Sequence, residues 1–477
     1  MIHPMSQRRR PARHGDPSVH SAAPGPGVRS TGLALLAMAA ILVGACDTGS
    51  GSIARAGSGA PTGGGSGPAV HSPSASAGSV AGSQPSIAGS SGPGDGGASP
   101  PSERPVAPPP SDPGGPATGQ PPATAYDPAK FGFAAKGLRG EVMAFVTTSQ
   151  VDDALARLDF EATSTIAFFS LVAGSTGAIN QDTRWRSWNG AQVDRLIARA
   201  HATGTKVVIS LARFAWSPAQ TKVSVALLSS DTARARLARA VADEVVRRGI
   251  DGVNVDFEPI PSGQRANFTD FVRRIRRELD ARGPGYQLTF DVVGHFESYD
   301  VGGALQPGGA DAVYLMGYHY AGTFSTIAHG TAPLGGSRYS VADAIRGLRT
   351  MAKPWQMIVG VPYYGHLWPT VSGALNARTT AAGYDVLYSS ARLIGARRGT
   401  IYDPIEQVQR VAWRGRSCAT CPVHWFQLYF DDARSLGAKW TEFRRQGLLG
   451  TGVWTSAFEG ESGDLSAALR KVWLAGG

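Results

Sequence analysis

The sequence predicts an α/β protein whose parallel strands close into a (β/α)8 TIM barrel with a small insertion between the seventh and eighth strands. Two observations predict this fold. Short apolar segments alternate with amphipathic helical patterns across residues 126–477, and such alternation implies parallel strand pairing. The number of these segments matches the eight strands of a closed barrel rather than an open sheet.

The expected strands are apolar and rich in β-branched side chains; they lie at 141–146, 164–173, 206–212, 252–258, 287–294, 312–318, 357–365 and 450–456. Between them, residues 231–249 and 265–283 carry apolar side chains at helical spacing. Asp231 is the expected N-cap of the first of these helices, and Gly249 its expected stop. The gap before the last strand is the longest, so we expect the insertion there.

Composition divides the chain into three parts. Residues 46–125 are dominated by Gly, Ser, Pro and Ala, so they cannot bury enough apolar surface to offset chain entropy. We expect this part to be a disordered tether. Residues 126–477 remain, and they have the usual size of one α/β barrel with insertions.

Residues 1–45 have the features of a signal peptide. Basic residues near Arg8 precede an apolar run, Leu33 to Val43, which is too short to span a bilayer comfortably. The run ends in VGAC, which resembles a bacterial lipobox, and this resemblance implies that Cys46 is diacylated. We therefore expect an extracytoplasmic protein anchored to the membrane through Cys46. The alternative is an ordinary cleaved signal and a secreted product.

Cys418 and Cys421 form a C-x-x-C pair inside the long gap. Outside the cell such a pair predicts a short-loop disulfide. Zinc is an alternative, but it needs four ligands and only His424 is nearby. Free thiols are the third possibility.

The formal net charge is +10. Such a balance favours contact with an anionic envelope surface or polymer, although a solvated Arg-rich surface explains it most simply. Nucleic acid is not an expected partner, because no basic run is interleaved with aromatic side chains.

The segment DGVNVDFE, 251–258, is the most informative part of the chain. Because alternate side chains of a strand share a face, Asn254, Asp256 and Glu258 point one way and the apolar residues between them point the other. Active sites lie at the carboxyl end of barrel strands, where this segment ends. Two carboxylates inside a barrel are costly without a purpose. The alternative is a structural acid pair satisfied by arginine.

This arrangement suits the cleavage of a glycosidic bond. The reaction needs an acid whose pKa is raised by burial or by a neighbouring charge, and Glu258, nearest the mouth, can serve. Asp256 lies too close to activate water in an inverting reaction, so it would orient a group of the substrate.

At these residues the chain resembles the family 18 glycoside hydrolases, the chitinase family, whose fourth strand reads D-G-x-D-x-D-x-E. Three further motifs are similar and follow in the family's order. They are LMGYHY (315–320), GVPYYGHLW (360–368) and FDDARSLGAKWTEFRRQGLLGTGVW (430–454).

The resemblance implies retaining, substrate-assisted cleavage of β-1,4-linked N-acetylglucosamine polymers, such as chitin or peptidoglycan, without metal or cofactor. Glu258 would be the acid and base, Asp256 would hold the acetamido N–H, and Tyr318 would bind its carbonyl. The other implied substrate-binding residues are Asn254, Met316, His319, Tyr363 and Trp454. We expect a monomer.

The chain departs from the family pattern at three places. Asn254 replaces the inner Asp, which removes a like charge and should let Asp256 ionise more readily. The variant is typical of a subgroup of spore-cortex and cell-wall lytic enzymes. His319 replaces an Asp, and SLAR (210–213) stands where S-x-G-G is usual.

Two other functions compete with hydrolysis. A sugar-binding protein on the same barrel is one, although lectins of this family generally lose the Glu that this chain keeps as Glu258. An envelope scaffold is the other.

Overall fold

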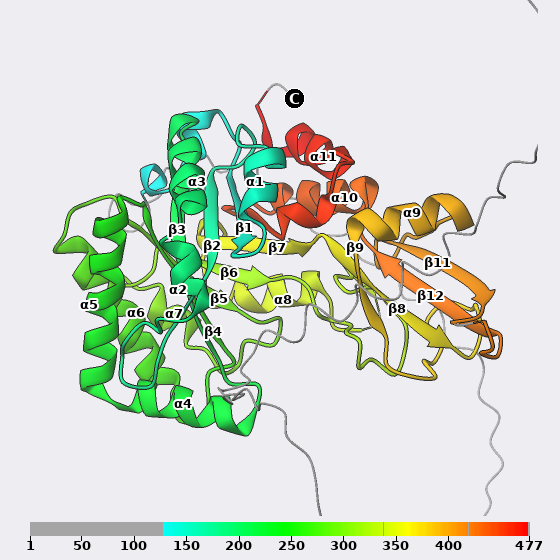
Figure 1. Cartoon of the computed structure of the whole chain (residues 1–477), viewed down its shortest axis with the longest axis horizontal. Helices are drawn as coiled ribbons and strands as arrows, with labels where there is room; N and C mark the ends of the chain where they lie inside the picture. Colours follow the sequence, from blue (N-terminus) through cyan, green and yellow to red (C-terminus); the bar gives the residue numbers. More distant parts are fainter. Residues whose placement is uncertain (1–126, 337, 418, 476–477) are drawn as a thin grey trace, which may run out of the picture. The chain divides into compact units, whose positions relative to one another are not determined.

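The computed structural model describes residues 127–336, 338–417 and 419–475 (Figure 1). The expected signal peptide and tether, Cys46 and Cys418 lie outside these residues. Cys421 is disulfide-bonded. Among the described residues, no helix is both long and apolar enough to cross a membrane.

Eight parallel strands form a closed barrel in the order β1-β13-β7-β6-β5-β4-β3-β2, which confirms the predicted fold. Each of the eight expected segments overlaps one of these strands, and β1 and β3 extend one and two residues beyond their segments. They are β1 (Glu141–Thr147), β2 (Thr165–Val172), β3 (Lys206–Phe214), β4 (Gly252–Glu258), β5 (Gln287–Val292), β6 (Ala312–Met316), β7 (Met357–Pro362) and β13 (Gly450–Trp454).

Helices follow the strands and bury their apolar faces against the outside of the barrel. The α-helices of the barrel layer are α1 (Val151–Arg157), α2 (Thr183–Trp188), α3 (Ala191–Ala202), α4 (Pro218–Ser229), α5 (Asp231–Arg248), α6 (Arg265–Asp280), α7 (Val301–Ala304), α8 (Val341–Leu348), α10 (Ala433–Arg445) and α11 (Asp464–Trp473). Short 3-10 helices are η1 (Pro128–Lys130), η2 (Ala134–Lys136), η3 (Pro354–Gln356) and η4 (Ser456–Glu459).

An insertion lies between β7 and β13, as predicted. It forms an antiparallel sheet whose strand order is β10-β11-β12-β8-β9. Its elements are β8 (Tyr364–Thr370), β9 (Tyr384–Leu387), α9 (Tyr388–Arg398), β10 (Ile401–Asp403), β11 (Val408–Gly415) and β12 (His424–Phe430). Figure 1 shows these strands in yellow to orange, with α9 over them.

A second apolar core fills the inside of the barrel, separate from the core beneath the helices. It contains Met143, Phe145, Val208 and Tyr314, with Trp454 packed against it. Tyr314 needs glycine opposite it, because a Cβ at position 360 would lie 2.2 Å from its hydroxyl and one at position 452 would lie 2.3 Å from its ring. The inner core closes the barrel beneath its carboxyl end.

Three element boundaries differ from the prediction. The expected strand 357–365 is two strands, since β7 ends at Pro362 and β8 begins at Tyr364. The expected strand 312–318 ends at Met316, so Tyr318 lies in the following loop. The N-cap of α5 is Ser230, whose side chain accepts from the Ala233 N–H, and Asp231 is the first helical residue. Gly249 does end α5, with φ 62°.

Candidate active site

The side chains of β4 alternate as predicted. Val253, Val255 and Phe257 are buried in the core beneath the helices, and the Phe257 ring stacks on Phe271 of α6 at 5.4 Å. Because successive side chains of a strand point to opposite faces, Asp256 and Glu258 point into the barrel. The helix layer therefore fixes the direction of both carboxylates.

The polar face of β4 becomes more accessible toward the carboxyl end of the strand. Asn254 is 0% exposed and Asp256 is 2% exposed, whereas Glu258 is partly exposed. Glu258 pairs with Phe214 at the end of β3, so it lies at the mouth of the barrel. A ligand at the mouth would meet Glu258 before Asp256.

The environment raises the proton affinity of both carboxyl groups. Burial raises the pKa of Asp256 to about 7. Burial also raises the pKa of Glu258 well above its usual range, and the neighbouring Asp256 charge raises it further. Burial is the largest cause of both shifts. A paired arginine would lower both pKa values, so their direction does not support the alternative of an acid pair satisfied by arginine.

Burial is the largest cause of the raised pKa of Asp256. The expectation that Asn254 lets Asp256 ionise more readily than an Asp at the same position would stays a prediction. A further carboxylate, Asp291 of β5, also lies inside the barrel, 2.6 Å from the Asn254 amide nitrogen. The inward faces of β4 and β5 therefore carry three carboxyl groups, and β4 contributes only two of them.

Sequence reasoning missed Asp291. It is 2% exposed and follows Gln287 and Thr289 on the same face of β5, and both of these are also buried. A polar residue at every second position in QLTFDV was the available signal. It indicates a second polar strand face inside the barrel.

Ser210, the residue of SLAR that matches the family pattern, joins this polar layer. Its hydroxyl donates to the Asn254 side-chain oxygen, and the Asn254 amide nitrogen donates to the Thr289 hydroxyl at 3.1 Å. Strands β3, β4 and β5 are thus tied together by side chains inside the barrel. This layer lies directly beneath Asp256.

Aromatic side chains surround the mouth. Trp454 ends β13, and its ring lies 4.7 Å from Phe169 and 5.5 Å from Phe145. Tyr318 is 8% exposed and its pKa is raised by burial and by nearby groups that include Glu258. The structure therefore brings Tyr318 together with the carboxylates, whereas Trp454 forms an aromatic cluster over the inner core.

Tyr364, rather than the expected Tyr363, lies beside Tyr318. The two rings are 6.4 Å apart, and Glu258 contributes to the raised pKa of Tyr364. Tyr363 is 3% exposed, and the charged groups around it are Glu459, Asp159 and Asp464. The structure does not bring Tyr363 together with the carboxylates.

His319 and Met316 lie on either side of Tyr318 in sequence. His319 has φ 64°, and its ring lies 5.8 Å from Tyr364 and 5.8 Å from His366. Burial, with a smaller effect of His366, lowers the pKa of His319 to about 4, so it is neutral at pH 7. It cannot supply the charge of the Asp that the family has there. Met316 ends β6 and packs against the inner core.

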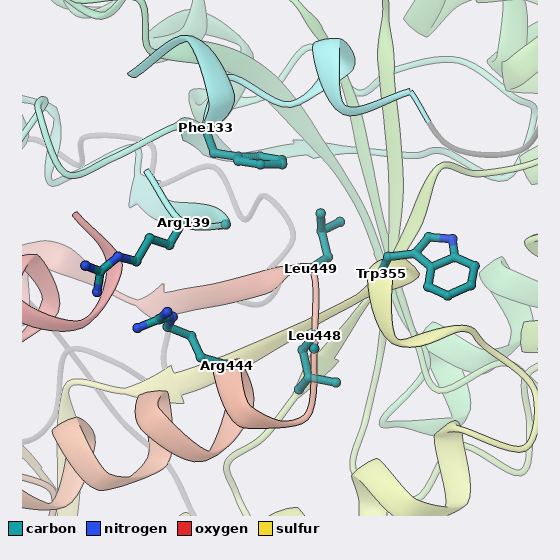
Figure 2. A pocket seen from close by; sticks show the side chains of 8 residues that line it. Phe133, Arg139, Trp355, Arg444, Leu448 and Leu449 are labelled. Carbon is teal, nitrogen blue, oxygen red and sulfur yellow. The ribbon is translucent and has the colours of Figure 1, made fainter. Parts of the chain in front are cut away.

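A surface hollow at the amino-terminal end of the barrel has no part in this site. It has a volume of about 320 Å³ and is lined by Phe133, Arg139, Gly140, Trp355, Arg444, Gly447, Leu448 and Leu449. Figure 2 shows that it lies where β13 begins, among residues that precede the strands. None of the three carboxylates lines this hollow. The candidate active site is therefore placed by its carboxyl groups and not by the hollow. Among the described residues, no group of His, Cys, Asp and Glu is placed to hold a metal ion.

The protein is thus a closed parallel barrel with two acidic side chains on β4 near its mouth. Comparison with known proteins shows the family to which it belongs. Residues 135–458 match the model of "Glycosyl hydrolases family 18", and the chain belongs to this family.

Among its relatives is the "Putative sporulation-specific glycosylase YdhD" of Bacillus subtilis (strain 168), at 27% identity over 247 residues. The match covers 49% of this chain and 53% of YdhD, so the chain spans about half the length of that relative.

Two solved structures show the same fold. A variant of the class V chitinase of Nicotiana tobaccum in complex with NAG4 has a TM-score of 0.61 at 15% identity, covering 71% of this chain and 99% of that one. The chitinase-like agglutinin of Robinia pseudoacacia has a TM-score of 0.60 at 18% identity, covering 69% and 99%.

Proposed function

We propose that the protein hydrolyses β-1,4-linked N-acetylglucosamine polymers with retention of configuration, and that Glu258 is its acid and base. The observation that carries this proposal is the placement of Asp256 and Glu258 on one inward face of β4, at the barrel mouth. Membership of family 18 supports the reaction class. The complex of a structural neighbour with NAG4 supports the substrate class.

In the proposed reaction the acetamido oxygen of the substrate attacks the anomeric carbon. Glu258 gives its proton to the leaving glycosidic oxygen as that bond breaks. Water then attacks the cyclic intermediate, and Glu258 takes a proton from it, which restores the acid. The raised pKa of Glu258 suits this role, because an acid must still be protonated near the working pH.

Asp256 would accept a hydrogen bond from the acetamido N–H, and its charge would stabilise the positive intermediate. Tyr318, in the loop after β6, would donate to the acetamido carbonyl. Trp454 would provide an apolar floor for the distorted sugar ring. Asn254, Met316, His319 and Tyr363 are the other expected substrate contacts. Asn254 lies in the polar layer beneath Asp256, and Tyr363 lies away from the carboxylates, so we do not include these two in the proposed contact surface.

Chitin and peptidoglycan both contain the required acetamido group. The likeness to YdhD and the GVNVDFE strand favour a cell-wall glycan. We further propose that the protein acts as a monomer outside the cytoplasmic membrane, attached by a lipid on Cys46, with secretion as the alternative. Such a position would place the barrel beside a cell-wall substrate.

The test compares the wild-type protein with Glu258→Gln on a fluorogenic chitooligosaccharide, followed by product analysis on chitin and on purified peptidoglycan. We expect Glu258→Gln to lose at least about 100-fold in turnover, because general acid catalysis contributes roughly that much, and to keep its affinity. Turnover by the variant at a tenth of the wild-type rate or more would falsify the role of Glu258.

The alternative function is carbohydrate binding without catalysis. The chitinase-like agglutinin with the same fold is the observation that favours it. In that case the wild-type protein and Glu258→Gln would bind the oligosaccharide equally, and neither would release product.

A further inference from the structure

The charges of the insertion are divided between the two ends of β11. Residues 386–402 and 407–430 contain no Asp or Glu, and their six arginines are Arg392, Arg397, Arg398, Arg410, Arg414 and Arg416. The two acids between these ranges, Asp403 and Glu406, lie at the start of β11, where Asp403 pairs with Val408. The sequence around the other end of β11 is therefore basic only.

Four of these arginines are exposed, and we call them the arginine patch: Arg397, Arg398, Arg414 and Arg416. The first two are the last residues of α9, which lies over the sheet of the insertion (Figure 1). Arg414 lies near the end of β11, and Arg416 follows this strand. The patch thus joins the end of one helix to the end of one strand.

Two tryptophans of the β11–β12 hairpin hold two of the guanidinium groups. The Arg398 group lies over the Trp413 ring at 4.6 Å, and the Arg414 group lies over the Trp425 ring at 6.0 Å. Trp413 and Arg414 are successive residues of β11, so the two stacked arginines lie on opposite faces of the sheet. The patch therefore extends around both faces of the hairpin end.

The stacked arginines keep their hydrogen-bonding capacity. Stacking uses the flat face of a guanidinium group, and its N–H donors point outward in the plane of that group. Among the described residues, Arg397, Arg398 and Arg414 make no hydrogen bond or ion pair. Arg416 donates to the carbonyl oxygen of Cys421 in the same hairpin. Because arginine does not lose its proton in proteins, the patch stays positive at every working pH.

We propose that the arginine patch is a docking surface for a glycan that carries carboxylate groups, and that this glycan is peptidoglycan. This inference rests on the proposed function and narrows its substrate class. Charge complementarity favours this partner, because the peptide branches of peptidoglycan carry carboxylates whereas chitin is neutral. The planar donor fork of an arginine binds a carboxylate through two parallel hydrogen bonds.

The position of the insertion gives this docking a use. The insertion follows the barrel directly, since β7 ends at Pro362 and β8 begins at Tyr364. Tyr364 lies beside Tyr318 near the carboxylates, so the same sheet reaches from the mouth to the patch. A polymer bound at the patch is thereby kept near the mouth, while the arginines take no part in breaking the bond.

The test is cosedimentation with insoluble peptidoglycan from which phosphate polymers have been removed, in the Glu258→Gln background so that no glycan is cut. We expect Arg398→Gln/Arg414→Gln/Arg416→Gln to bind at least about tenfold more weakly at low salt, because one arginine near an anionic surface contributes about a factor of five. The difference should shrink toward 1 M salt, where the Debye length is about 3 Å. Binding equal to that of the background protein at low salt overturns the proposal.

The matched control removes the same charge from exposed arginines outside the insertion, as Arg139→Gln/Arg349→Gln/Arg444→Gln. It should bind peptidoglycan within about twofold of the background protein, because these side chains are not part of the patch. An equal loss in both triple variants would show that only net charge matters, which overturns a specific docking surface.

Two changes of the ligand test its chemistry without any change of the patch. Peptidoglycan whose carboxylates are converted to neutral amides should bind at least about tenfold more weakly, and chitin should show no difference between the background protein and the patch variant. Unchanged binding to the amidated polymer overturns the proposal. Binding that requires wall phosphate polymers also overturns it, because the partner would then be a phosphate ester.

Turnover separates this proposal from the proposed function. The patch variant with Glu258 retained should cut a soluble neutral chitooligosaccharide at the wild-type rate, because that ligand carries no carboxylate. Absence of turnover by the wild-type protein together with patch-dependent binding overturns only the hydrolase. Normal turnover together with patch-independent binding overturns only the docking surface.

Discussion

Glu258 and Asp256 are two residues apart on one strand, yet their surroundings suit them to different tasks. Glu258 is partly exposed at the mouth and has a like charge beneath it, which favours its protonated form. Asp256 is almost fully buried and lies deeper on the same face of the strand. One strand therefore carries both the proposed acid, Glu258, and a second carboxyl group, Asp256, in a different environment.

At the residue scale, the support from Asp256 predicts a kinetic signature for Asp256→Asn. The contact with the acetamido group strengthens as positive charge develops, so its loss should fall on kcat rather than on KM. We expect kcat to fall by about 100-fold or more, a typical cost of removing one group that stabilises transition-state charge, with KM changed by less than about threefold. Steady-state kinetics on the fluorogenic chitooligosaccharide measure both, and an unchanged kcat would contradict this role.

The residues of the site were predictable where one short pattern determines them. Strand alternation alone predicted that Asp256 and Glu258 share a face. The motif LMGYHY (315–320) predicted that Tyr318 joins them. Asp291 was not found, because its hydrogen bond with Asn254 depends on the register between β4 and β5. The two residues are far apart in the sequence, and the sequence does not state that register. Tyr364 was passed over for Tyr363, because the break between β7 and β8 decides which of two adjacent tyrosines faces the mouth.

At the element scale, the motif FDDARSLGAK has a structural role. Asp432 is the N-cap of α10, and its side chain accepts a hydrogen bond from the Ser435 N–H. The Ser435 hydroxyl oxygen accepts one in return from the Asp432 N–H. Asp431 pairs with Lys439, and both side chains are almost completely buried. The motif thus fixes the start of α10 against the end of β12, rather than contributing to the site.

This buried pair predicts a large effect of Lys439→Met on stability. The substitution leaves Asp431 buried without its cation, so we expect a loss of about 3–5 kcal/mol in the free energy of unfolding at pH 7. Chemical denaturation measures this loss. Asp431→Leu/Lys439→Met is the matched control, and it should recover most of the stability because neither charge remains. Equal stability of the single variant and the wild type would show that the pair contributes nothing.

Element type was more predictable than element boundaries. All eight barrel strands lie within or across their expected segments, because apolar β-branched runs between helical patterns leave little alternative. The predicted N-cap of α5, Asp231, was wrong by one residue, and Ser230 is the N-cap. Ser and Asp both cap helices well, so only the path of the backbone decides between them. The end of β7 was missed because the apolar run continues into the insertion.

At the scale of the whole molecule, buried acids lie at both ends of the barrel. Glu141 is the first residue of β1, at the amino-terminal end, and burial raises its pKa to about 7. Asp256, Glu258 and Asp291 lie toward the other end. Of these four acids only Glu258 is partly exposed, and the inner apolar core lies between the two ends. The two groups can therefore be separated by experiment.

Glu141 should limit stability at alkaline pH without affecting catalysis. A carboxyl pKa that rises from 4.5 to about 7 on folding stabilises the protonated folded state, so stability is lost as pH rises through about 7. The shift corresponds to about 3 kcal/mol at high pH. Glu141→Gln removes this titration; we expect it to raise the unfolding free energy at pH 8.5 by about 1–3 kcal/mol and to change it little at pH 5. Denaturant unfolding at the two pH values measures this difference in free energy. The pH profile of kcat for Glu141→Gln should coincide with that of the wild type. An equal effect on stability at both pH values would mean that Glu141 acts by packing and not by its charge.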